Sequence, residues 1–268
     1  MAIIQMNYVS GALFRTVPVQ VILPVDKRTP DGKLPAPKKY KTLYLLHGLL
    51  GNYTDWVSGT RIQRWAEERD LAVVMPSGDN SFYVDRPADR NNYGEFIGRE
   101  LVEITRRMFP LSDKKEDTFI GGLSMGGYGA VRNGLKYSDT FGAVIGLSAA
   151  LHVFENKPLT AAHRAFGDAI FGDMELAAKS DMNPRVLLER LAGKKDLPKI
   201  YLACGTEDDL LPASRLYRDL MTEAGFHVTY FEGPGKHDWD FWDDQIKRVI
   251  DWLPLDGKSQ GINSGNVK

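Results

Sequence analysis

One serine, set between glycines, constrains the possible fold of this chain more than any other feature. It lies where an apolar run ends and a helix-forming segment begins. Ser124 lies in Gly122-Leu123-Ser124-Met125-Gly126, after the apolar run 117–121 and before a segment that can open a helix, 127–131. This pattern is typical of a nucleophile elbow, a tight strand-to-helix turn that lifts a serine hydroxyl above a sheet edge. The turn leaves no room for side chains beside the serine, so glycine is needed on both sides. The alternative is a glycine-rich turn that only lets a helix pack close to a strand.

Apolar runs and helical patterns alternate through most of the chain. Strands are expected at 41–46, 71–75, 117–121, 141–147, 199–203 and 227–231, and helices at 61–69, 95–108, 213–224 and 241–252. Continuous apolar strands separated by helices predict an α/β fold whose mainly parallel sheet is covered on both faces. Residues 3–23 are expected to add an antiparallel pair of strands, with prolines tolerated at an edge. In the helix at 95–108, Phe96, Leu101, Ile104 and Met108 are expected near one face.

We expect a single domain over residues 1–255, followed by a flexible polar tail at 256–268. Residues 151–197 lie between two expected strands and are longer than one crossover helix needs. They suggest a small, partly helical cap over the carboxyl edge of the sheet, where ligands bind in open α/β sheets. A crossover with one extra surface helix is the alternative.

Charge and composition narrow the classes of partner. The net charge of -1 over 268 residues points to neither nucleic acid nor an anionic membrane. The segment 1–5 lacks a basic region followed by a long apolar stretch, so a cytoplasmic protein is expected. The single cysteine, Cys204, follows an apolar run and is predicted to be a buried core thiol. These features favour a small-molecule partner and leave open whether the chain forms a homo-oligomer.

A serine hydroxyl needs a base, which is usually histidine. In α/β-hydrolases the chain order is serine, acid, histidine, with the base after the last strand. Of the five histidines, His237 alone fits this order, because it lies between the last expected strand and the last expected helix. The alternative is a histidine on a surface loop.

The acid that orients the histidine is expected after the strand at 199–203. Three neighbouring carboxylates are candidates there. We rank Asp208 first, Asp209 second and Glu207 third, although spacing does not decide between them. For a tetrahedral oxyanion, one donor is expected to be the backbone N–H of Met125, directly after the serine. The second is expected to be the N–H of Leu49, on a glycine-containing loop where His47 has a supporting role.

The chain resembles the esterase D-like branch of the α/β-hydrolases, and most closely its tributyrin-type carboxylesterases. The resemblance covers most of residues 40–252 and rests on five segments: 46–51 with Trp56, 75–80, 122–130, 204–208 and 235–239. It implies an α/β-hydrolase fold and Asp208 as the acid. S-formylglutathione hydrolases of this branch usually carry Asp-Thr-Ser-Pro-Arg-Gly where this chain has Pro76-Ser77-Gly78-Asp79-Asn80, and that departure counts against glutathione thioesters.

Four aromatic residues on loops at the expected catalytic edge are candidates for an acyl pocket: Trp56, Phe82, Tyr83 and Trp239. Packing between loops is the alternative for each. No cofactor is expected, and no metal, since no His/Cys/carboxylate group has metal-ligand spacing. We therefore expect a serine carboxylesterase that hydrolyses short acyl esters through an acyl-enzyme. The alternatives are a feruloyl or acetyl xylan esterase, an acyltransferase, and a non-catalytic binding protein on this scaffold.

Overall fold

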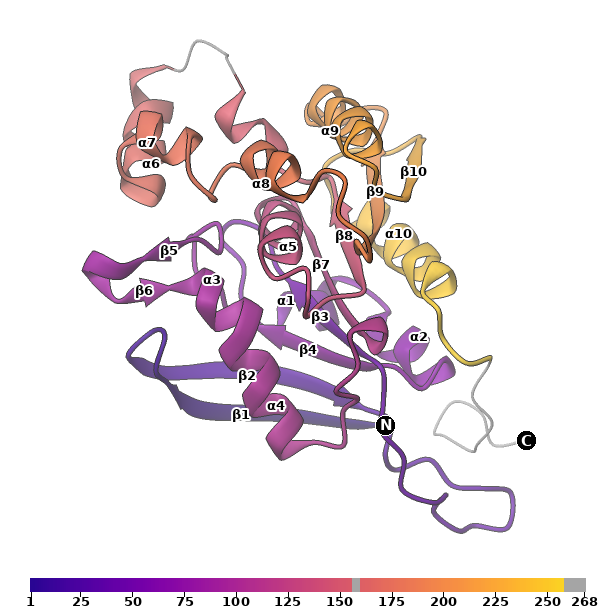
Figure 1. Cartoon of the computed structure of the whole chain (residues 1–268). Helices are drawn as coiled ribbons and strands as arrows, with labels where there is room; N and C mark the ends of the chain where they lie inside the picture. The colour runs from indigo at the N-terminus through magenta and orange to yellow at the C-terminus, as the bar shows by residue number, and fades with distance from the viewer. Residues whose placement is uncertain (156–159, 258–268) are drawn as a thin grey trace.

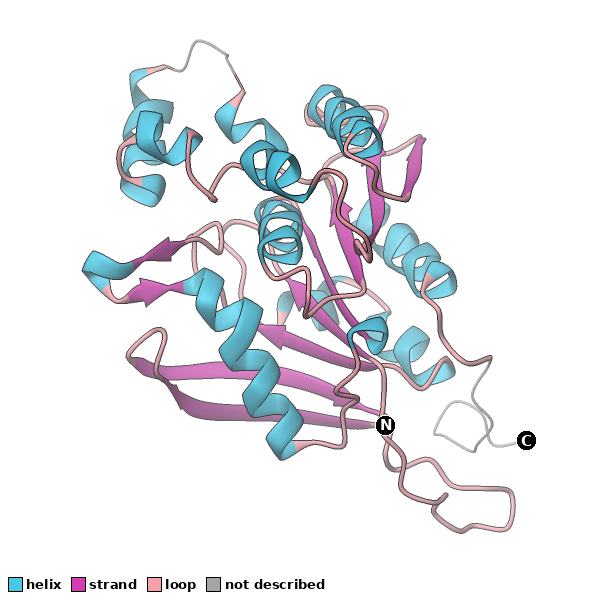
Figure 2. Ribbon diagram, viewed as in Figure 1, coloured by secondary structure: helices cyan, strands magenta, loops and turns pink. Residues whose placement is uncertain are grey.

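The computed structural model describes residues 1–155 and 160–257, which form a layered α/β structure around one large sheet (Figures 1 and 2). Over these residues the sheet has eight strands in the order β1-β2-β4-β3-β7-β8-β9-β10. They are β1 (Ala2–Ser10), β2 (Arg15–Leu23), β3 (Thr42–Leu46), β4 (Ala72–Pro76), β7 (Thr118–Leu123), β8 (Ala143–Leu147), β9 (Lys199–Gly205) and β10 (Val228–Gly233). β1, β2 and β4 pair antiparallel, and every pairing from β4 to β10 is parallel. The predicted opening strand pair and parallel sheet are confirmed.

The sheet has an apolar core on each face. Along β3, Leu43 and Leu45 point into one core, whereas Tyr44 and Leu46 point into the other, as the two-residue period of a strand requires. The first core is covered by α1 (Asp55–Gly59), α2 (Ile62–Glu68) and α10 (Trp239–Trp252). The second is covered by α4 (Leu101–Met108), α5 (Met125–Lys136), α8 (Pro184–Leu191) and α9 (Leu211–Glu223). The predicted double cover is thus confirmed, and Cys204 is buried as expected.

The segment expected as one helix at 95–108 has three parts. α3 (Tyr93–Glu95) leads into a π-helical turn, η2 (Phe96–Glu100), before α4 begins. Met108, the last residue of α4, is 50% exposed, whereas Phe96 and Leu101 are buried. A short hairpin, β5 (Asp85–Arg86) and β6 (Asn91–Asn92), was not predicted, since strands of two residues carry no period.

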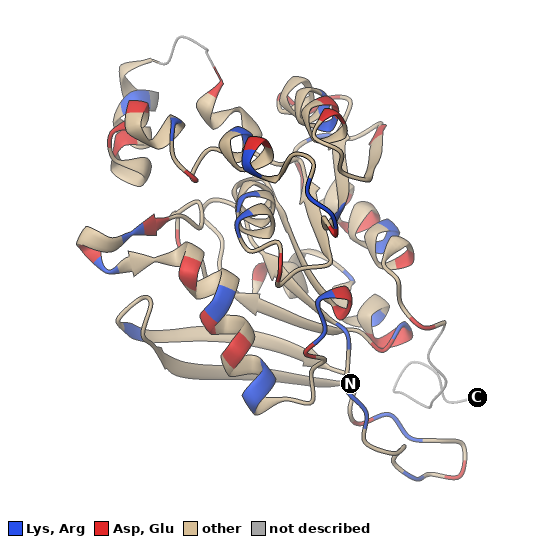
Figure 3. Cartoon of the chain, viewed as in Figure 1, with Lys and Arg blue, Asp and Glu red and all other residues tan. Residues whose placement is uncertain are grey.

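The segment 151–197 is partly helical where it is described. It contains η4 (Leu151–Phe154), α6 (Ala161–Phe171), α7 (Met174–Ala178) and α8, and we call it the cap (Figure 1). Residues 258–268, most of the predicted tail, lie outside the described residues. Within the described part of the chain, no helix is both long and apolar enough to cross a membrane. Charges of both signs are interspersed along the helices, in keeping with the small net charge (Figure 3).

A buried arginine joins the cap to α5. The Arg132 side chain is 0% exposed, and its guanidinium donates to the Asp181 carboxylate at 2.7 Å and to the Asp181 carbonyl at 3.0 Å. Lys136 lies 2.9 Å from both Asp181 and Asp85. One helical turn before Arg132 in α5, the Tyr128 hydroxyl donates to the Met182 carbonyl. The start of α8 is therefore fixed to the helix that follows Ser124.

Candidate active site

Ser124 occupies a strained turn between β7 and α5. Its backbone has φ 53° and ψ -117°, a conformation that few residues other than glycine adopt. A Cβ at Gly122 would lie 2.4 Å from backbone atoms of Gly126, and a Cβ at Gly126 would lie 2.4 Å from the Leu46 carbonyl oxygen. Contacts this short are not tolerated between backbone and side chain, so the prediction that both flanking glycines are required is confirmed.

His237 links the serine to a carboxylate. Its Nε2 lies 3.0 Å from the Ser124 Oγ, and its Nδ1 lies 2.9 Å from the Asp208 Oδ2. The His237 side chain is 39% exposed, whereas that of Asp208 is 1% exposed. The loops carrying the two residues are in close contact, because the Gly235 carbonyl accepts the Glu207 N–H at 3.0 Å and a Cβ at Gly205 would lie 2.2 Å from the same oxygen.

Burial and hydrogen bonding distinguish Asp208 from the two neighbouring carboxylates. Asp209 and Glu207 are exposed, but Asp208 is buried and faces the histidine. Burial by itself raises the pKa of Asp208, but hydrogen bonds from His237, from the Leu210 N–H and from Ser148 outweigh it and hold the pKa below its usual value. Asp208 is therefore the carboxylate placed to face an imidazolium while ionised.

The loop after β3 approaches Ser124 from one side. A Cβ at Gly48 would lie 3.5 Å from the Ser124 Cβ, and Leu49 follows with 40% of its surface exposed. Met125 is the first residue of α5, so its N–H lies in the first helical turn, where backbone donors have no partner within the helix. Both predicted oxyanion donors thus belong to segments next to the serine.

His47 is buried beneath this loop. Its Nε2 accepts the Gly78 N–H at 2.8 Å, and its Nδ1 lies 2.7 Å from the Gly48 carbonyl, to which it donates. Burial lowers the pKa of His47, which agrees with a neutral ring bonded at both nitrogens. The expected supporting role of His47 is confirmed.

The four aromatic candidates for the acyl pocket have different surroundings. Trp56 and Tyr83 are 1% and 0% exposed, and they donate hydrogen bonds to the Leu46 and His47 carbonyls. These contacts favour the alternative of packing between loops for both rings, because each bonds the backbone at the start of the loop after β3. Phe82 is also buried and contacts cap rings, whereas Trp239 is partly exposed and packs on Trp56.

Sequence reasoning missed three residues that contact the site. Asn80 accepts the Leu50 N–H at 2.8 Å and so holds the loop after β3. Trp242 of α10 packs against the His237 ring at a centroid distance of 5.0 Å and donates its Nε1–H at 3.1 Å to the hydroxyl of Ser148, directly after β8. The bond from the Leu50 N–H to Asn80 spans 30 positions and that from Trp242 to Ser148 spans 94, so no local period encodes either contact.

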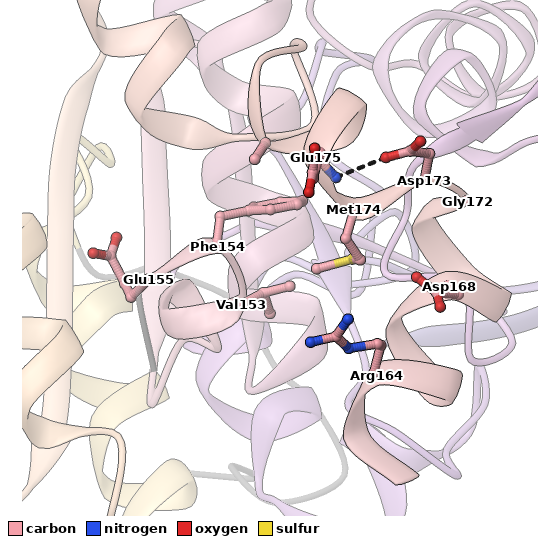
Figure 4. A pocket seen from close by; sticks show the side chains of 10 residues that line it. Val153, Phe154, Glu155, Arg164, Asp168, Gly172, Asp173, Met174 and Glu175 are labelled. Atoms are coloured by element: carbon pink, nitrogen blue, oxygen red, sulfur yellow. Dashed lines mark hydrogen bonds between the residues drawn. The ribbon is translucent and has the colours of Figure 1, made fainter. Parts of the chain in front are cut away.

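A separate cavity of about 800 Å³ opens within the cap. Val153, Phe154 and Met174 form an apolar part of its lining, and Arg164 and Asp168 of α6 lie beside them (Figure 4). None of Ser124, Asp208 and His237 lines this cavity. It is therefore a feature of the cap and not the place where the serine, histidine and carboxylate meet.

The fold and the site together define the class. A mainly parallel sheet covered on both faces, with a serine on a strand-to-helix turn and a histidine after the last strand, is that of an α/β-hydrolase. The family model described as "Putative esterase" matches residues 10–253, and the chain belongs to this esterase family. It is an enzyme of the serine hydrolase class that acts on carboxylic ester bonds.

Known proteins similar to the chain agree with this assignment. An acetyl esterase of Caldicellulosiruptor saccharolyticus is 43% identical over 263 residues, which cover 94% of this chain and 98% of that protein. The structure of an S-formylglutathione hydrolase of Staphylococcus aureus is 33% identical, covers 94% of this chain and 98% of its own, and has a TM-score of 0.80. A ferulic acid esterase with a TM-score of 0.77 over 94% of this chain and 97% of its own is 21% identical and shows the fold alone.

Proposed function

We propose that the protein is a carboxylesterase that hydrolyses short-chain acyl esters, with Ser124 as nucleophile, His237 as general base and Asp208 as the acid that orients it. The observation that carries the proposal is the continuous chain of hydrogen bonds at the elbow, 3.0 Å from serine to histidine and 2.9 Å from histidine to carboxylate. Activation of a serine by a histidine that a third group orients is the requirement for covalent catalysis of acyl transfer.

In the proposed reaction the Ser124 Oγ attacks the ester carbonyl carbon while the His237 Nε2 takes the hydroxyl proton. The negative charge that forms on the carbonyl oxygen is stabilised by the N–H groups of Leu49 and Met125. His237 then gives its proton to the leaving alcohol oxygen as the ester C–O bond breaks. Water, deprotonated by His237, then attacks the acyl carbon. The bond from that carbon to the Ser124 Oγ breaks, the carboxylic acid leaves, and His237 returns the proton to the Ser124 Oγ. Asp208 accepts the Nδ1–H throughout and stabilises the imidazolium.

The preference for short acyl groups has two supports. The similar acetyl esterase is named for the smallest common acyl group. The cap also packs an aromatic cluster on the loop after β4, since Phe171 lies 5.3 Å from Phe82 and 5.1 Å from Phe154, measured between ring centroids. We propose that these rings limit the length of acyl chain that the site accepts.

A second candidate, hydrolysis of S-formylglutathione, is favoured by the 33% identity to a hydrolase of that name. The segment Pro76-Ser77-Gly78-Asp79-Asn80 argues against it, as does the higher identity to the acetyl esterase. Feruloyl esters and acetylated xylan are further candidate substrates, supported by the family resemblance alone. Acyl transfer to an alcohol is a further activity to test. A location in the cytoplasm stays a prediction.

A substrate panel tests the proposal. We expect kcat/KM on p-nitrophenyl esters to be highest between acetate and butyrate and to fall by octanoate. Each methylene that still fits gains about 0.8 kcal/mol of burial, so the fall marks the end of the pocket. Methyl ferulate, acetylated xylo-oligosaccharides and S-formylglutathione are assayed beside the series, and added alcohol reveals any acyl transfer. A kcat/KM that keeps rising through dodecanoate contradicts the short-chain proposal, and a much higher value on S-formylglutathione favours the second candidate.

A further inference from the structure

The loop after β4 holds both ends of the loop after β3. At the beginning of the loop after β3, the His47 Nε2 accepts the Gly78 N–H at 2.8 Å. At its end, the Tyr53 N–H donates to the Ser77 hydroxyl oxygen at 3.2 Å. The loop after β3 carries Leu49, the proposed oxyanion donor. The position of this donor therefore depends on the neighbouring loop.

The middle of the loop after β3 is a tight turn with an unfavourable backbone. The Gly51 N–H donates to the Gly48 carbonyl at 3.3 Å, which places Leu49 and Leu50 at the two central positions of the turn. Leu50, at the second of these, has φ 65°, where a turn of this kind usually has glycine. Leu50 is 91% exposed, so side-chain packing does little to hold this conformation. A residue other than glycine therefore needs support from outside the turn.

Asn80, in the loop after β4, provides this support. Its Oδ1 accepts the Leu50 N–H at 2.8 Å, from a residue 30 positions away in the sequence. The residue before Asn80 is itself bonded, since the Asp79 carboxylate accepts the Arg15 guanidinium at 3.0 Å and also the Tyr93 hydroxyl. The acceptor for the Leu50 N–H is thus carried by a loop that has its own anchors.

The same bond determines which N–H of the turn remains for a substrate. The Leu50 N–H is taken by Asn80, and the N–H of the next residue is taken by the turn itself. Throughout the described part of the chain, nothing accepts a hydrogen bond from the Leu49 N–H. A Cβ on the preceding residue, Gly48, would lie 3.5 Å from the Ser124 Cβ, so the available N–H belongs to the segment beside the nucleophile.

We propose that Asn80 is a positioning residue for the oxyanion hole. By holding the Leu50 N–H it keeps the turn in one conformation, and so keeps the Leu49 N–H directed at the carbonyl oxygen of the ester. The inference rests on the proposed function, since it assigns a support to a proposed oxyanion donor. Donors that are already aimed at the developing charge need no reorganisation during the reaction, so a small change in their direction is costly.

The first test compares Asn80→Ala with Asn91→Ala. Asn91 is a matched control, because its Oδ1 also accepts a hydrogen bond at 2.8 Å, but from Arg15 and not from the loop after β3. We expect Asn80→Ala to lower kcat on p-nitrophenyl acetate about 10- to 100-fold, less than the roughly 10²–10³-fold loss when an oxyanion donor is removed outright. KM should change little, because the charge on the oxygen develops only in the transition state. The control should keep kcat within about twofold of wild type.

A short alkyl trifluoromethyl ketone provides a readout that a merely structural role would not move. The Ser124 Oγ adds to its carbonyl carbon, His237 takes the hydroxyl proton, and the ketone oxygen becomes an oxyanion in the proposed hole. Because this adduct resembles the transition state, its inhibition constant should rise in Asn80→Ala by about the factor by which kcat/KM falls. An inhibition constant that stays at the wild-type value overturns the positioning role, whether or not kcat changes.

A double-mutant cycle with Leu50→Gly tests the route through the turn. Glycine adopts a positive φ without strain, so the turn should depend less on Asn80 when residue 50 is glycine. We expect Asn80→Ala to lower kcat less than about threefold in the Leu50→Gly background, well below its effect in the wild type. The same loss in both backgrounds overturns the proposal. Asn80 and Leu50 are both exposed, so all of these variants should fold, and melting temperatures check this.

Failure of this inference can be distinguished from failure of the proposed function. Turnover and fluorophosphonate labelling that survive Ser124→Ala would overturn the proposed nucleophile, whatever Asn80 does. Loss of both in Ser124→Ala, together with wild-type kcat and a wild-type inhibition constant in Asn80→Ala, would leave the proposed function standing and overturn only the role of Asn80.

Discussion

The catalytic edge and the cap of this protein are built in different ways. At the catalytic edge, the segments that follow β7, β8, β9 and β10 are joined by backbone hydrogen bonds, and Leu50, Ser124 and Ser148 have positive φ angles. The cap consists of short helices that contact the rest of the chain through aromatic rings and ion pairs. It leaves Phe166 and Leu176 46% and 67% exposed.

On the proposed function, we expect this difference to separate the part that fixes the reaction from the part that selects the substrate. Backbone geometry holds the reacting groups within a narrow range of positions, as acyl transfer requires. The cap's contacts depend on side chains, so single substitutions can change its shape without moving the strands. We therefore expect changes at the catalytic edge to abolish turnover and changes in the cap to alter selectivity.

The largest effect expected is that of Ser124→Ala. Loss of the nucleophile should lower kcat on p-nitrophenyl acetate by a factor on the order of 10⁴ to 10⁶, as in other serine hydrolases that lose a triad member. Labelling by a fluorophosphonate should also disappear. Near-normal turnover in this variant would show that the chemistry does not depend on the elbow.

Asp208→Asn should come next, with a fall in kcat of about 10⁴. The neutral amide cannot stabilise the imidazolium and favours the wrong imidazole tautomer. Asp209→Asn, one residue away and exposed, is the matched control and should stay near wild type. A larger fall in Asp209→Asn than in Asp208→Asn would mean that the acid is one residue further along the chain.

Phe171→Ala tests the cap. Phe171 is 5% exposed and contacts Phe82, Tyr128 and Phe154, so its truncation should cost about 3–5 kcal/mol of unfolding free energy. We expect kcat on the acetate ester to fall less than tenfold while the octanoate-to-acetate ratio of kcat/KM rises. Phe14→Ala is the control, because Phe14 is 69% exposed; it should change neither kcat on the acetate ester nor the octanoate-to-acetate ratio. A lower melting temperature with the same chain-length preference would show that these rings do not set acyl length.

The smallest effect expected is on stability at acid pH. The folded-state pKa of Asp208 is lowered, so its ionisation stabilises the fold above the unfolded value of about 3.9, and this stability is lost as pH falls through the folded pKa. Urea midpoints between pH 7 and pH 3 should therefore drop more steeply below about pH 4 in the wild type than in Asp208→Asn. Parallel curves would mean that Asp208 has the same pKa in both states.

The sequence predicted the features that depend on local patterns. Ser124 could be found because the elbow needs glycine on both sides, and His237 because chain order places the base after the last strand. Asp208 could not be separated from Asp209 by spacing, since the difference between them is burial, which only the folded structure shows. Family resemblance, and not the residues alone, favoured Asp208.

Long-range contacts account for what the sequence did not predict. Trp56 and Tyr83 look like pocket aromatics in the sequence, but their donors bond backbone carbonyls within the protein. The bond from Trp242 to Ser148 joins residues 94 positions apart, and no periodicity encodes it. Catalytic roles for the named residues stay predictions until the variants are measured.

The buried arginine described above has a consequence for making variants with new selectivity. Because Arg132 fixes Asp181 to α5, the cap divides into a fixed base at α8 and an outer part at α6 and α7. Breaking a buried ion pair costs about 3–5 kcal/mol, so a library that randomised Asp181 would lose folded members. A library confined to the exposed positions of α6 and α7, such as Phe166 and Leu176, would leave both that anchor and the buried Phe171 intact. The exposed face of the outer cap is thus the part that can be varied, and different selectivities could be built on one unchanged catalytic frame.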